Sequence, residues 1–74
     1  MNYVYDVFDV RGRYSRTVNC QSVAEQLKGG DIAYLADDIP GNRKAYADGT
    51  LHILPPPPTL LHYADPVSLS WVRD

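Results

Sequence analysis

A run of four prolines, Pro55 to Pro58, is the feature that most restricts how this 74-residue chain can fold. Proline has no backbone N–H to donate to a sheet, and its fixed φ favours an extended polyproline II segment. The run should therefore end any sheet formed before it. We expect an α+β core with ββαβ order plus a hairpin in residues 1–54, and a proline-led segment in residues 55–74 that packs on this core as an edge strand.

The N-terminal part predicts two paired strands. Residues 2–10 are rich in β-branched and aromatic side chains, which suit a strand with apolar groups on both faces. Arg11 and Gly12 follow, and glycine adopts the positive φ of a tight turn at little steric cost. Apolar and polar residues then alternate from Arg13 to Cys20, which predicts a second strand antiparallel to the first.

The next segment predicts the only helix. Ser22 and Glu25 have the spacing of a capping box, in which side chains satisfy backbone donors at a helix start. Gly29 and Gly30 supply the left-handed residue that ends helices, so we expect a helix of about two turns. Residues 31–37 fit both helical spacing and strand alternation, and we favour a strand there.

Two further signals predict strands in the rest of the chain. Asp48 and Gly49 stand between two short runs that suit strands, and an Asp-Gly pair in this position is typical of a hairpin turn. Residues 67–72 alternate apolar and polar side chains, which predicts a last strand at a sheet edge. The expected class is α+β: a small, mostly antiparallel sheet of about five or six short strands packed by one short helix.

The net charge and the cysteine content indicate where the protein is located and which kinds of partner it binds. A formal net charge of −2 gives a field too weak to indicate nucleic acid or a membrane surface by itself. Cys20 is the only cysteine, so no internal disulfide can form, and we expect a cytoplasmic protein. The first residues lack a basic leader pattern, and prolines interrupt the longest uncharged run. We therefore expect no targeting segment and no membrane partner.

The sequence carries no recognisable catalytic pattern. Cys20 with His52 or His62 is the one Cys/His combination, but a small thiol at a strand end is more often a core residue. The two histidines are not spaced like zinc ligands, and Asp37 and Asp38 point to opposite faces of an extended chain. No glycine-rich phosphate loop precedes a helix. We expect no enzyme activity, no catalytic residues, no cofactor and no metal.

Aromatic side chains make protein binding the favoured function. Large aromatic residues are the usual anchors of protein interfaces. The candidate anchors are Tyr14, Tyr34, Tyr63 and Trp71. We expect a small non-catalytic inhibitor or adaptor that binds a larger protein machine, a type of chain that bacteriophages and mobile elements often encode. A free edge strand would also allow a homodimer.

Two alternatives remain open at this stage. The first hairpin carries three arginines that could contact the phosphates of single-stranded nucleic acid: Arg11, Arg13 and Arg16. Pairing of these arginines with Asp6 and Asp9 on the neighbouring strand is the favoured explanation for them. The other alternative is a structural subunit that associates with itself. The proline run with Leu60, Leu61 and Trp71 could also serve as a proline-rich ligand for the aromatic groove of another protein. We favour the alternative that these three side chains complete the core of this protein.

Overall fold

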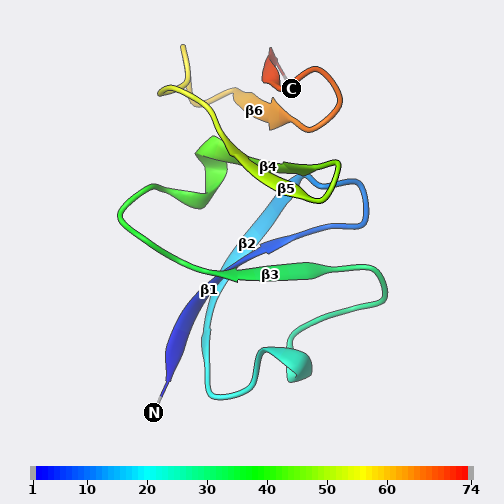
Figure 1. The fold of residues 1–74 in the computed structure, drawn as a ribbon. Helices are drawn as coiled ribbons and strands as arrows, with labels where there is room; N and C mark the ends of the chain where they lie inside the picture. Colours follow the sequence, from blue (N-terminus) through cyan, green and yellow to red (C-terminus); the bar gives the residue numbers. More distant parts are fainter. Residues whose placement is uncertain (1, 74) are drawn as a thin grey trace.

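The computed structural model describes residues 2–73 (Figure 1). These residues form seven short strands and two 3₁₀ turns, joined by loops. In chain order the elements are β1 (Tyr3–Phe8), β2 (Tyr14–Cys20), η1 (Val23–Glu25), β3 (Ile32–Leu35), η2 (Gly41–Arg43), β4 (Lys44–Ala47), β5 (Thr50–Ile53), β6 (His62–Asp65) and β7 (Ser70–Arg73). The strands form three antiparallel sheets with the orders β2-β1-β3, β4-β5 and β6-β7. The described chain is thus all-β, and none of its helical segments is long and apolar enough to cross a membrane.

The predicted α-helix is wrong, and with it the α+β class. Ser22 is extended and its side chain makes no cap hydrogen bond, and the segment forms only one 3₁₀ turn, closed by the Gln26 N–H on the Val23 carbonyl at 2.9 Å. The turn has no buried residue. A helix of about two turns is marginal without tertiary packing, so the capping-box spacing alone does not form one.

The first hairpin and the strand in residues 31–37 are confirmed. β1 pairs with β2 on one side and with β3 on the other, so β1 is the central strand, as its apolar faces predicted. The connecting turn is wider than two residues. Asp9 Oδ1 accepts the backbone N–H groups of Arg11 and Arg13 at 2.9 and 3.1 Å, and Gly12 adopts a φ of +90°.

The second hairpin is also confirmed. Asp48 and Gly49 have φ values of +53° and +76°, and positive φ at both central positions defines the turn that matches the twist of a hairpin. The prolines follow β5 without strand structure, as expected. Within the C-terminal part, β6 was not predicted. The predicted strand at 67–72 begins only at Ser70, because Leu69 adopts a left-handed φ of +53°.

The buried apolar side chains are Val7 and Phe8 of β1 together with Ala45, Leu54 and Ala64, which form one cluster. The Phe8 ring has edge contacts with Tyr14 and Tyr34, at centroid distances of 6.0 and 6.2 Å. Trp71 of β7 packs against Ala45, Leu54 and Ala64, which connects the last sheet to the β4-β5 hairpin.

Candidate binding surface

Three hairpin turns lie at one end of the molecule (Figure 1). They are residues 9–13 between β1 and β2, residues 48–49 between β4 and β5, and residues 66–69 between β6 and β7. We call these three turns the turn end. The Tyr46 N–H donates to the Gly12 carbonyl at 2.8 Å, so the first turn is joined directly to β4. Segments far apart in the sequence therefore form one surface.

Two adjoining cavities open at the turn end. The larger, of about 450 Å³, is lined by residues of all three turns together with Ile32 and Tyr46. The smaller, of about 250 Å³, includes Arg13 and Tyr63 in its wall. Arg11, Pro66 and Val67 line both cavities. The larger volume lies within the range of small-ligand pockets, so it can accept a side chain or a short segment of a partner.

Two valines at these cavities are open to solvent. Val10 is 75% exposed and Val67 is 91% exposed, and both line the larger cavity. A single exposed apolar residue needs no explanation on a protein surface. Two of them beside one concave site form an apolar contact that a partner can cover.

Carboxylates hold two of the turns in place. Asp9 accepts the backbone bonds already described, and Asp65 Oδ2 accepts the Ser68 N–H at 3.0 Å and the Ser68 hydroxyl at 2.7 Å. These hydrogen bonds from Ser68 lower the pKa of Asp65 below its ordinary value of 3.8. Arg11 has no carboxylate within ion-pair distance among residues 2–73. Its guanidinium is available to an acidic group on a partner.

The four predicted aromatic anchors lie in different places. Tyr14 and Tyr34 are half-buried against Phe8, and Trp71 packs on the core with its Nε1 donating to the Pro55 carbonyl at 2.8 Å. Only Tyr63 lines a turn-end cavity, where the Arg13 guanidinium lies 3.7 Å from its ring centroid. Val10, Val67 and Pro66 were not singled out from the sequence, since nothing local shows that their turns meet.

The three predicted arginines are also separated. Arg11 and Arg13 lie at the turn end, whereas Arg16 of β2 is 3.7 Å from Asp31 and donates to the Gln26 carbonyl. Asp6, which we expected to pair with these arginines, binds Lys44 instead. The structure therefore does not gather the three guanidinium groups into one patch.

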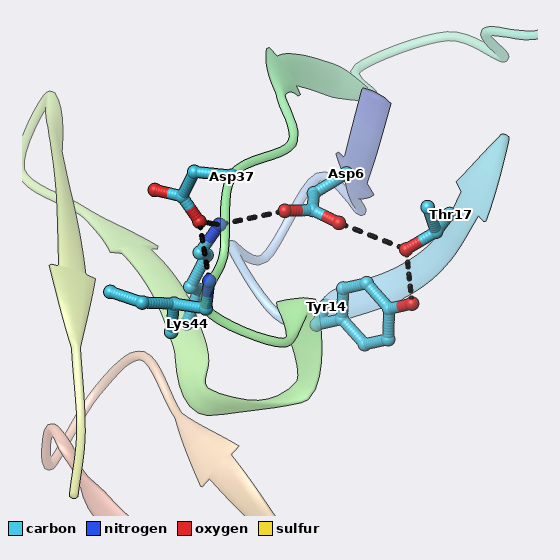
Figure 2. A network of polar contacts seen from close by, with 6 residues as sticks. Asp6, Tyr14, Thr17, Asp37 and Lys44 are labelled. Carbon is cyan, nitrogen blue, oxygen red and sulfur yellow. Dashed lines mark hydrogen bonds and ion pairs between the residues drawn. The ribbon is translucent and has the colours of Figure 1, made fainter. Parts of the chain in front are cut away.

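A buried ion network connects the sheet to β4 (Figure 2). Lys44 Nζ lies 2.8 Å from both Asp6 Oδ2 and Asp37 Oδ1, and the side chains of Lys44 and Asp6 are only 1% and 3% exposed. Thr17 Oγ1 donates to Asp6 Oδ1 at 2.9 Å and contacts the Tyr14 hydroxyl at 2.6 Å. No side-chain polar atom of the network is both buried and unpartnered in the described chain.

The electrostatics of this network favour a structural role. Burial alone lowers the pKa of Lys44, but hydrogen bonds and charges from Asp37 and Asp6 outweigh it and raise the pKa above 10.5. The ammonium group therefore stays protonated at neutral pH and cannot act as a nucleophile or base. Sequence reasoning missed this network, although Asp6 within an otherwise apolar strand was a signal for a buried partner.

Asp37 should make the stability of the protein depend on acid pH. Hydrogen bonds from Lys44 and from the Ile39 N–H lower the pKa of its carboxyl below 3.8. The stability from its ionised form is then complete above pH 3.8 and is lost as the pH falls through the folded pKa. In urea unfolding between about pH 5 and pH 2, the wild type should lose stability more steeply than Asp37→Asn. Parallel curves would contradict this assignment.

The remaining candidate residues, Cys20, His52 and His62, lie on three different strands. Cys20 lies at the end of β2, His52 is in β5, and His62 Nδ1 is 2.8 Å from the Thr59 hydroxyl. Within residues 2–73, no group of three or more His, Cys, Asp or Glu could hold a metal ion.

Comparison with known proteins gave no matching family model, curated protein or solved structure. The chain is a small all-β protein of three antiparallel sheets with a concave surface where its hairpin turns meet.

Proposed function

We propose that the protein is a non-catalytic binding module that takes up a segment of a partner protein at the turn end and so acts as a small inhibitor or adaptor. The observation that carries this proposal is the 450 Å³ cavity with the exposed Val10 and Val67 in its wall. A partner side chain that fills such a cavity excludes water from both valines, which is the arrangement of a binding hot spot.

The chemistry of the cavity indicates the kind of segment. Its lining is mixed: the exposed Val10 and Val67 favour an apolar anchor residue, and Arg11 favours a carboxylate beside that anchor. The turns are held by Asp9 and Asp65 before any partner binds. A surface ordered in advance loses less conformational entropy on association, which favours affinity.

The nucleic-acid alternative has less support. Arg16 is held by Asp31 away from Arg11, and the turn-end cavities include Asp9, Asp48 and Asp65 in their walls. Proteins that bind single strands present a continuous basic groove with open aromatic faces. Phosphate binding would also weaken steeply with salt, whereas binding at an apolar cavity should change little.

Selection from a displayed random-peptide library tests the proposal. Peptides captured by the immobilised wild-type protein should bind at least about 30-fold more weakly to Val67→Asp and to Val10→Asp, because each change places a carboxylate in the apolar contact. Leu60→Asp is the matched control, since Leu60 is 94% exposed but lies outside both cavities. It should leave binding unchanged.

Two results would count against the turn end as the binding surface. One is equal binding of the selected peptides to wild type and to both valine variants. The other is a set of amide shifts, on adding peptide, that leaves Val10, Arg11, Tyr46 and Val67 unmoved. Both measurements require the variants to keep the amide spectrum of a folded protein.

A further inference from the structure

We propose that the outer edge of β2 pairs antiparallel with the β2 edge of a second copy of this chain, joining two three-stranded sheets into one. This surface is separate from the turn-end cavities and does not depend on the proposed function. β2 is the longest strand, with seven residues, and it stands at the edge of the sheet with order β2-β1-β3.

The backbone pattern shows which groups of β2 are unpaired. The Val4 carbonyl accepts the Ala36 N–H at 2.9 Å, so the polar backbone groups of Val4 point toward β3. The backbone N–H and C=O groups of the next residue, Tyr5, must then point toward β2, because these groups point to opposite sides in successive residues of a strand. Tyr5 is paired with Val18, so Val18 uses its backbone groups on β1.

The residues on either side of Val18 therefore point outward. The N–H and C=O groups of Thr17 and Asn19 face away from β1, and no other described segment hydrogen-bonds to them. The edge is paired only at its start, where Arg13 forms a single bridge with Ala45 of β4. Rows of unpaired backbone groups of this kind are templates for another strand.

The sequence of β2 fits a copy of itself. A two-fold pairing centred on Thr17 places Arg16 opposite Val18 of the second copy and Asn19 opposite its Ser15, which is the extra residue at a register shift against Val7 and Phe8 of β1. Arg16 is the only charged residue of β2, so this register puts no like charges opposite each other. The side chains of Ser15 and Asn19 are exposed and able to hydrogen-bond across the junction. β2 contains no proline and no lysine, the residues that commonly protect an edge from pairing.

The sheet face beside this edge carries Arg16 and several apolar side chains that are only partly covered. Tyr3 lies opposite Cys20, and Tyr5 lies opposite both Val18 and Leu35, so these side chains share one face. Tyr3 and Leu35 on this face are 47% and 62% exposed. Pairing two β2 edges would place two such faces side by side, with Val18 and Arg16 of each copy at the junction. A second copy therefore continues the backbone hydrogen bonding of the sheet.

The test measures the mass of the full chain in solution. Sedimentation equilibrium of the wild type should give twice the 8.3 kDa chain mass as concentration rises toward about 1 mM. Asn19→Pro removes one outward N–H and none of the β1-β2 hydrogen bonds, so it should keep the folded spectrum and sediment as a monomer. Asn19→Ala keeps that N–H and should associate like the wild type. A wild type that stays at 8.3 kDa, or an Asn19→Pro variant that still associates, overturns the proposal.

Cysteine cross-linking tests the register. Ser15→Cys and Asn19→Cys, each made with Cys20→Ser, should form a mixed disulfide when the two variants are combined and oxidised, since opposite Cα atoms lie about 5.5 Å apart. Each variant alone should not cross-link, because its two cysteines would be about 14 Å apart along the paired strands. Equal cross-linking of the single variants and of the mixture would overturn the register and with it the proposed pairing.

Discussion

Replacing Lys44 with methionine is expected to unfold much of the protein at neutral pH. Methionine has a similar length, so the change mainly removes the ammonium group that lies 2.8 Å from Asp6 Oδ2. Asp6 would keep only Thr17 as a side-chain partner, with its carboxylate buried. Leaving one charge of a buried pair unpaired costs about 3–5 kcal/mol, which is comparable with the whole stability of a chain this small. Urea unfolding followed by the fluorescence of the single Trp71 measures the loss.

Two variants separate the lost charge from lost packing. Asp37→Asn removes the second carboxylate but leaves the Lys44–Asp6 pair, and the Asp37 side chain is already 56% exposed, so its loss should be much smaller. Asp6→Leu combined with Lys44→Met removes both buried charges and should regain most of the stability, because apolar pairs often replace buried ion pairs without loss. If Lys44→Met is as stable as Asp37→Asn, the buried pair does not hold β1 to β4.

Local turn chemistry explains which strands could be predicted from the sequence. Asp48 and Gly49 both adopt positive φ, and this requirement is local, so the residue pair alone located the hairpin. The alternation in residues 13–20 similarly located β2. The capping-box spacing at Ser22 is just as local, but a helix also needs an apolar face that packs, and the η1 turn buries none of its residues.

The candidate site depends on contacts between distant residues, so the sequence did not locate it. Asp6 and Lys44 are 38 positions apart, and each by itself is typical of an exposed residue. Val10 and Val67 similarly belong to two turns that are far apart in the sequence and line one cavity only in the folded chain. The aromatic residues chosen as anchors have large apolar surfaces, and in a chain this small three of the four are half-buried against Phe8 or the core cluster.

Replacing Gly12 with alanine is the second change expected to have a large effect. An added Cβ would lie 1.8 Å from the Tyr46 carbonyl oxygen, which is backbone and cannot move aside easily, and the φ of +90° is itself unfavourable for alanine. The backbone conformation costs about 1–2 kcal/mol and the overlap adds about 1–3 kcal/mol. We expect a loss of more than about 2 kcal/mol in urea unfolding, together with weaker peptide binding by the molecules that stay folded.

Gly49→Ala is the matched control for this prediction. Gly49 also has a positive φ, of +76°, but no atom lies within 4 Å of the position of an added Cβ. Its replacement should therefore cost only the conformational part, about 1 kcal/mol, and should leave the turn end in place. The difference between the two variants measures the close approach of the first turn to β4. Equal losses of stability would mean that the contact between Gly12 and Tyr46 does not hold the first turn against β4. The first turn would then not be a fixed part of the wall of the larger cavity.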